Sequence, residues 1–130
     1  SSAGIGFILM VFTAFQGLLH GFIDLVFEHD GRYWLADYKS NRLEDYGHAG
    51  LEEAMAEHHY PLQALIYSLA LHRHLGQCLP DYDPARNLGG VFYLFTRGMR
   101  PDGDAGIWHR QVEPALLARF DEMLKGRAVA

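Results

Sequence analysis

Short runs of mostly apolar residues recur along the chain, and polar segments that contain glycine or proline separate them. Runs of this length, bounded in this way, are typical of strands. The runs are residues 5–12, 18–29, 32–40, 89–97 and 107–112. Residues 5–12 and 89–97 are continuously apolar, which predicts buried strands, and residues 107–112 are expected as a short edge strand.

The remaining apolar residues recur at helical spacing. We expect a short helix over residues 51–59, a break at Pro61, and a second helix from there to about Leu75, with Gly76 as its stop signal. Pro114 is expected to begin a last helix. The residues expected to pack inward from these two longer helices are Leu62, Leu65, Ile66, Leu69, Leu75, Leu116, Leu117, Phe120 and Leu124. Strands mixed with helices predict an α/β fold.

Asp30-Gly31 joins the run over residues 18–29 to the run over residues 32–40. This dipeptide between apolar runs is the strongest local signal for a two-residue hairpin turn. Counting outward from the turn pairs Phe27 with Trp34 and sets Asp24 opposite Asp37. Residues opposite each other share a face of the sheet, and Lys39 lies two residues beyond Asp37 on that same face. The pattern therefore predicts two carboxylates and one ammonium at one end of the hairpin.

Two opposed carboxylates in a mostly apolar sheet are destabilising unless something compensates their charge. Mg²⁺ suits them, because it takes oxygen ligands and is commonly held by one or two carboxylates together with waters and phosphate oxygens. Lys39 would then stabilise charge on a phosphate or orient a water, which suggests phosphodiester hydrolysis. The alternative is a structural ion cluster in which Lys39 only neutralises Asp24 and Asp37.

Composition narrows the class of protein. A chain of 130 residues with 49% hydrophobic content fits one globular domain, and we expect residues 1–130 to form a single domain. The lone Cys78 excludes an internal disulfide framework and fits a reducing cytoplasm. The net charge of −5 argues against a protein that binds DNA by a basic surface alone. Arg97, Arg100 and Arg110 are open to two interpretations: a small phosphate-contacting cluster, or ordinary solvated side chains.

Membrane and targeting segments are not expected. The eight-residue apolar run over residues 5–12 is too short to span a bilayer, and no charged start or cleavage site marks it as a signal peptide. No cysteine and histidine spacing typical of a zinc site is present in the sequence.

The string GFIDLVFEHDGRYWLADYKSN, followed by HHYPLQALIYSLALHRHL and LGGVFYLFTRG, resembles the PD-(D/E)xK nuclease superfamily, and within it the RecB-type nuclease domains of exodeoxyribonuclease V beta subunits. The resemblance runs from about Leu18 to Leu124. It implies a restriction-endonuclease-like fold, with a central mixed sheet flanked by helices. It also implies that Asp24 and Asp37 bind the metal, with the backbone carbonyl of Tyr38 as a further ligand, and that Lys39 is catalytic.

The same resemblance places Gln63 and Tyr67 in an element beside the active site, on the substrate side; from the residues alone, a solvated helix face explains them equally well. The family also carries a metal-ligating histidine on a helix well upstream. His20, the only early histidine, is too close to the hairpin for that role, although the strand pattern places it on the face of Asp24. The resemblance therefore predicts an incomplete set of metal ligands, and the beginning of the chain, residues 1–17, is atypical of the family.

For function, the resemblance implies a Mg²⁺-dependent DNA nuclease. It would be one module of a longer cytoplasmic helicase–nuclease that acts on single-stranded DNA ends in double-strand break repair and in degradation of linear DNA, beside RecC- and RecD-like subunits. The alternative is a non-catalytic interaction module that docks the recombinase RecA. Exonucleases of the same superfamily with an iron–sulfur cluster are less compatible, because Cys78 alone cannot supply the cluster's ligands.

Overall fold

The protein is described from a computed structural model, which covers residues 4–6, 10–14 and 19–129, with side chains described over residues 23–125. A five-stranded mixed sheet has the order β1-β4-β5-β6-β7, and a separate two-stranded sheet pairs β2 with β3. Among the strands that the structure describes, only β5 and β6 are parallel neighbours. The elements are β1 (Gly4–Gly6), β2 (Met10–Ala14), β3 (Leu19–Ile23), β4 (Leu25–His29), β5 (Arg32–Lys39), α1 (His48–Glu57), α2 (Tyr60–Cys78), α3 (Pro84–Asn87), β6 (Leu88–Phe95), β7 (Ile107–Arg110) and α4 (Pro114–Val129).

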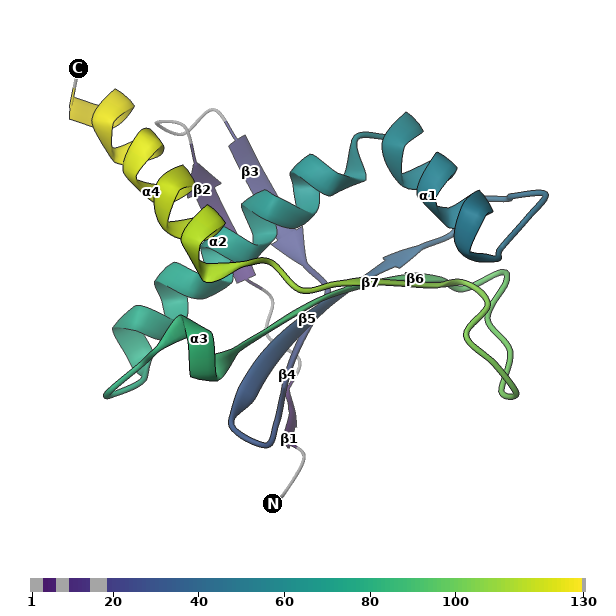
Figure 1. Ribbon diagram of the computed structural model, residues 1–130, viewed down its shortest axis with the longest axis horizontal. Helices are drawn as coiled ribbons and strands as arrows, with labels where there is room; N and C mark the ends of the chain where they lie inside the picture. The colour runs from purple at the N-terminus through teal and green to yellow at the C-terminus, as the bar shows by residue number, and fades with distance from the viewer. Residues whose placement is uncertain (1–3, 7–9, 15–18, 130) are drawn as a thin grey trace.

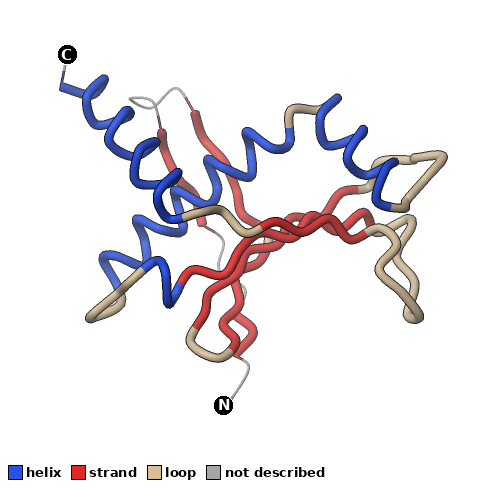
Figure 2. The backbone as a smooth tube through the Cα atoms, in the orientation of Figure 1, coloured by secondary structure: helices blue, strands red, loops and turns tan. Residues whose placement is uncertain are grey.

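The core lies between this sheet and the helices α1, α2 and α4, which share one side of it (Figure 1; Figure 2). The most completely buried side chains come from the central strands and the facing helices. They include Tyr93, Phe95, Leu35, Met55, Leu71 and Leu117. A mixed sheet flanked by helices confirms the predicted restriction-endonuclease-like α/β architecture. Within the described residues, none of the helices is long and apolar enough to cross a lipid bilayer.

The β4–β5 hairpin forms in the predicted register. Asp30 and Gly31 have φ values of 52° and 78°, which are the positive values that a type I′ turn requires at both central residues. Phe27 pairs with Trp34, and the ladder runs back as far as Leu25 opposite Ala36. The two-residue turn is thus confirmed as the feature that fixes this register.

The strand predicted over residues 18–29 is wrong as one element. The chain bends at Asp24, and β3 on one side of the bend pairs with β2, whereas β4 on the other side pairs with β5 and β1. Asp24 therefore does not form a ladder pair with Asp37. It stands just beyond the end of the hairpin.

A single strand over residues 5–12 is also wrong. Its residues contribute to β1 and β2, which belong to different sheets: Ile5 pairs with Phe27 of β4, and Met10 pairs with Ile23 of β3. One straight strand could not follow both partners, because β3 and β4 diverge at Asp24. The predicted burial of residues 5–12 lies outside the described side chains.

The boundaries of the first two helices differ from prediction at both ends. The first helix, α1, begins three residues earlier than expected, at His48, and the break before Pro61 is made by His59, whose φ of 58° is left-handed. Gly76 does not stop α2, which continues to Cys78; the chain turns only afterwards, at Asp81, where φ is 60°. A glycine near a helix end is a stop signal only when its backbone becomes left-handed, and Gly76 keeps a helical conformation.

Two of the leucines predicted to face inward are exposed. Leu62 on α2 is 56% exposed and Leu116 on α4 is 42% exposed, whereas Leu117 and Leu124 are buried as predicted. Leu116 is exposed although the next residue, Leu117, is fully buried, because neighbouring residues of a helix point about 100° apart.

Candidate active site

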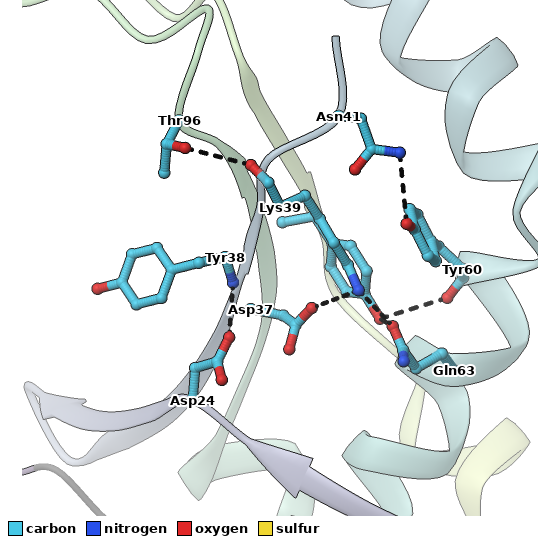
Figure 3. A network of polar contacts seen from close by, with 9 residues as sticks. Asp24, Asp37, Tyr38, Lys39, Asn41, Tyr60, Gln63 and Thr96 are labelled. Atoms are coloured by element: carbon cyan, nitrogen blue, oxygen red, sulfur yellow. Dashed lines mark hydrogen bonds and ion pairs between the residues drawn. The ribbon is translucent and has the colours of Figure 1, made fainter.

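The predicted site residues gather where the parallel strands β5 and β6 end. Asp37 is paired with Tyr93 in the parallel register, so both side chains rise from the same face of the sheet, toward α2. Figure 3 shows Asp24, Asp37 and Lys39 beside Gln63 of α2. The carboxyl ends of parallel strands are a common place for sites in α/β folds, because helix ends and loops converge there.

Asp37 is a buried carboxylate with an incomplete set of partners. The residue is 4% exposed, and its Oδ2 atom accepts no well-aligned hydrogen bond, although Nζ of Lys39 lies 2.8 Å from it. Burial raises the pKa of Asp37 above its ordinary value, and the negative charge of Asp24 adds to this effect while Lys39 opposes it. Oδ2 thus retains the capacity to bind a further electropositive group.

Asp24 is exposed and is held by the backbone of the opposite strand. Its Oδ2 atom accepts a hydrogen bond of 2.9 Å from the N–H of Tyr38 (Figure 3). This contact takes the place of the predicted ladder pair with Asp37 and still leaves the two carboxylates close enough to interact, as the effect of Asp24 on the pKa of Asp37 shows. The side chain of Tyr38 points away from the cluster and is 47% exposed.

Lys39 is enclosed on several sides, and its side chain is only 15% exposed. Nζ donates a hydrogen bond of 3.2 Å to Oε1 of Gln63, and it lies 4.1 Å from the ring centroid of Tyr60, a cation–π distance. The backbone carbonyl of Lys39 accepts hydrogen bonds from the N–H and the hydroxyl of Thr96, just after β6. Both ends of this lysine are therefore fixed.

Gln63 and Tyr67, one turn apart on α2, both face the cluster. Tyr67 is 7% exposed, and burial, followed by the negative charges of Asp37 and Asp24, raises the pKa of Tyr67 to about 12. Its phenol is accordingly protonated at neutral pH and can donate a hydrogen bond. The structure brings together all five predicted side chains: Asp24, Asp37, Lys39, Gln63 and Tyr67.

Three further residues of the site were not predicted. Tyr93 donates a 2.6 Å hydrogen bond to Oε1 of Gln63, Tyr60 places its ring over Lys39, and Asn41 donates from Nδ2 to the Tyr60 hydroxyl at 3.4 Å. Tyr93 lies inside an apolar run and has no sequence signal of its own. Its place beside Asp37 follows only from the parallel pairing of β5 with β6.

Among the residues whose side chains are described, no group of three or more His, Cys, Asp or Glu is placed to hold a metal ion. Asp24 and Asp37, with the carbonyl of Tyr38 between Asp37 and Lys39, supply oxygen donors only. Such a set fits Mg²⁺, which is usually held by one or two carboxylates and completes its octahedron with waters and substrate oxygens. Oδ2 of Asp37 is buried and accepts no well-aligned hydrogen bond besides its ion-pair contact with Lys39, which supports this fit. The backbone of His20 lies in β3, and its side chain is outside the described residues.

Arg97 and Arg110 do not gather in one cluster, which favours the interpretation of ordinary solvated side chains. Arg97 follows the end of β6 and donates from Nε to the carbonyl of Ser40, whereas Arg110 lies near the other end of that strand, opposite Val91. Arg110 is bonded to Glu52 at 3.3 Å and its guanidinium lies over the ring of Trp108. These arginines are surface side chains with local partners.

Comparison with known families places this fold and cluster in a class. The family model of the PD-(D/E)XK nuclease superfamily matches residues 2–129, and the chain belongs to that superfamily.

The relatives narrow the class further. The chain is 46% identical over 114 residues to the RecBCD enzyme subunit RecB of Haemophilus influenzae, which covers 85% of this chain and 9% of that protein. The corresponding subunit of Escherichia coli is 46% identical over 120 residues, with 88% of this chain and 10% of that protein covered. The resemblance to RecB-type nucleases is thereby confirmed, and the chain spans about a tenth of the length of these relatives.

Proposed function

We propose that this chain is the nuclease domain of a RecB-like helicase–nuclease and hydrolyses DNA phosphodiester bonds with Mg²⁺. The observation that carries the proposal is the cluster of Asp24, Asp37 and Lys39, in which a buried carboxylate oxygen faces an ammonium 2.8 Å away. Membership of the nuclease superfamily and the similarity to RecB support it. The proposed setting is the cytoplasm, in double-strand break repair and degradation of linear DNA, beside RecC- and RecD-like subunits.

In this proposal each residue of the cluster has one role. Asp24, Asp37 and the carbonyl of Tyr38 would hold Mg²⁺, which when bound supplies Lewis acidity at the phosphate. Lys39 would stabilise the negative charge that develops on the phosphate or orient the attacking water. Gln63 and Tyr67 would contact substrate, and the protonated phenol of Tyr67 is suited to donate to a phosphate oxygen.

The test is cleavage of end-labelled linear single-stranded DNA by the whole chain, with and without Mg²⁺. Asp37→Ala and Lys39→Ala should each lower the rate by about 10²-fold or more, the loss expected when a group that stabilises transition-state charge is removed. Lys125→Ala is the matched control, because Lys125 is the only other lysine in the sequence and is exposed on α4. Metal-dependent cleavage that survives in Lys39→Ala would overturn the assignment of the lysine.

A second candidate function is an interaction module that docks RecA. It is favoured by a groove of about 510 Å³ between α2 and α4, lined by Leu65, Trp108 and the exposed Leu116. A groove with apolar walls suits an apolar segment of a protein partner. Titration with RecA separates the candidates: binding that Leu116→Asp abolishes, without metal-dependent cleavage by the parent chain, would favour the module.

A further inference from the structure

The side-chain amide of Gln63 is held from two sides through one atom. Its Oε1 accepts a 2.6 Å hydrogen bond from the hydroxyl of Tyr93 and a 3.2 Å hydrogen bond from Nζ of Lys39. A lysine ammonium has only donors, so the amide oxygen and not the amide nitrogen must face it. The two contacts use both lone pairs of Oε1 and leave the NH₂ group of Gln63 directed elsewhere.

Tyr93 is built to be a rigid donor. The residue is fully buried at 0% exposure, and its ring packs edge-on against Trp108 at 5.7 Å and beside Tyr60 at 5.5 Å. Burial, and after it the charge of Asp37, raises the pKa of Tyr93 well above its ordinary value, so the phenol keeps its proton. The hydroxyl is thus a permanent donor at a fixed point beside the end of β6.

The ammonium of Lys39 has few alternative positions. It lies between Oδ2 of Asp37 at 2.8 Å and Oε1 of Gln63 at 3.2 Å, and the ring centroids of Tyr60 and Tyr93 are 4.1 Å and 5.3 Å away. A lysine side chain has several rotatable bonds and by itself carries about 2 kcal/mol of rotamer entropy. Oε1 of Gln63 contacts the ammonium on the side opposite Asp37, so it keeps the ammonium in place beside Asp37.

We propose that Tyr93 is a positioning residue of the nuclease site: its hydroxyl fixes the amide of Gln63, and that amide fixes the ammonium of Lys39 beside Asp37. The inference rests on the proposed nuclease function and adds to it a residue that never touches the substrate. Three side chains are linked in series: Lys39 on β5 contacts Gln63 on α2, and Gln63 contacts Tyr93 on β6.

The kinetic test is Tyr93→Phe in the whole chain. Loss of the hydroxyl frees Gln63 to rotate, and kcat for metal-dependent cleavage should fall about 10- to 100-fold while KM for DNA stays unchanged, as expected when a reacting group is misplaced by about 1 Å. Tyr82→Phe is the matched control. It removes a tyrosine hydroxyl that bonds His72 at 2.8 Å, away from the cluster, and should leave kcat unchanged.

A double substitution separates positioning from a general structural effect. If Tyr93 acts through Gln63, then Tyr93→Phe together with Gln63→Ala should cleave at the rate of Gln63→Ala alone. Losses that multiply would show that Tyr93 acts independently of Gln63 and would overturn the inference.

A measurement without activity completes the test. The sequence contains two lysines, Lys39 and Lys125, so lysine labelled with ¹³C at Cε gives two NMR signals and the exposed Lys125 serves as the internal reference. In the parent chain the Cε order parameter of Lys39 should exceed that of Lys125, and in Tyr93→Phe it should fall toward the Lys125 value. An unchanged order parameter would refute the role of Tyr93 even in a chain that cleaves nothing. Absence of metal-dependent cleavage by the parent chain would refute the proposed nuclease function separately.

Discussion

At the scale of single residues, Asp121 shows how a carboxylate joins two helices. Its Oδ1 atom accepts from Nε and Nη2 of Arg73 on α2, at 2.7 Å and 2.6 Å, and its Oδ2 atom faces Nζ of Lys125 at 3.2 Å. Burial alone would raise the pKa of Asp121, but the hydrogen bonds from Arg73 and Lys125 outweigh it and the pKa lies below its ordinary value of 3.8. The ionised form therefore stabilises the fold.

Replacement of Asp121 should make stability less dependent on pH. The stabilisation is complete above the unfolded-state pKa of 3.8 and is lost as the pH falls through the lower folded-state pKa. Asp121→Asn should therefore lower the free energy of unfolding in urea by about 0.5–1 kcal/mol at pH 7, a value appropriate to a partly solvated pair, and by less at pH 3. Glu122→Gln is the control, because Glu122 is exposed and makes only a long ion-pair contact of 3.7 Å with Lys125. A difference that is the same at both pH values would contradict this account.

Sequence patterns predicted the charged residues of the site. They did not predict the residues that reach the site only through contacts between elements far apart in the sequence. Asp37 and Lys39 lie on one strand of the hairpin and Asp24 directly precedes the other, so a single turn places them near one another. Tyr60 and Tyr93 come to Lys39 from α2 and β6, and no local pattern specifies which apolar-run tyrosine will face the cluster.

At the scale of elements, one close approach determines how β6 lies beside β5. A Cβ atom built on Gly89 would overlap Cδ2 of Trp34, so the indole ring rests directly on the glycine. The ring of Trp34 stacks on that of Phe27 of β4, with 6.4 Å between the ring centroids. It also contacts the tilted ring of Phe92 of β6, with a centroid distance of 5.6 Å. The glycine thus leaves room for an aromatic row that crosses three strands.

Gly89→Ala should displace this ring and destabilise the protein. Overpacking of this kind costs about 1–3 kcal/mol, which a urea unfolding curve detects as a lower midpoint with an unchanged slope. Gly103→Ala is the control, since a Cβ there meets nothing within 4 Å. If both variants unfold at the same urea concentration as the parent chain, the packing of Trp34 on Gly89 is not a constraint on the fold.

Elements were predictable where their signals are local. The turn at Asp30-Gly31 and the start of α4 at Pro114 were correct, because a backbone preference of one or two residues decides each. The division of residues 5–12 between two sheets was missed, since it depends on the bend at Asp24 in a different segment.

At the scale of the whole molecule, charge limits how the protein meets DNA. The formal net charge is −5, from 11 Lys and Arg against 16 Asp and Glu. Several of the described cations are already engaged in ion pairs; these are Lys39, Arg73, Arg110 and Lys125. Because acidic residues outnumber basic ones, delivery of DNA by other parts of a larger assembly fits the proposed function better than capture by this surface.

Binding of single-stranded DNA by the chain alone should be weak and only slightly dependent on salt. Each phosphate neutralised on a single strand contributes about −0.7 to the slope of log K against log salt concentration, and contacts to about three phosphates give a slope of about −2. Fluorescence anisotropy with a labelled oligonucleotide between 50 and 200 mM salt, in metal-free buffer, measures it. A slope of about −5 or steeper would reveal a basic surface that the charge count does not suggest.

The parallel neighbours β5 and β6 also set the order in which the site can assemble as the chain folds. A hairpin with a two-residue turn closes in about 1–10 μs, so Asp24, Asp37 and Lys39 can meet early. Lys39 and Gln63 are 24 positions apart, and Gln63 and Tyr93 are 30 apart, so the contacts that hold the ammonium wait for long loops to close. Recovery of cleavage after dilution from denaturant should therefore occur later than formation of the hairpin. The time at which activity returns then reports when β6 has paired with β5.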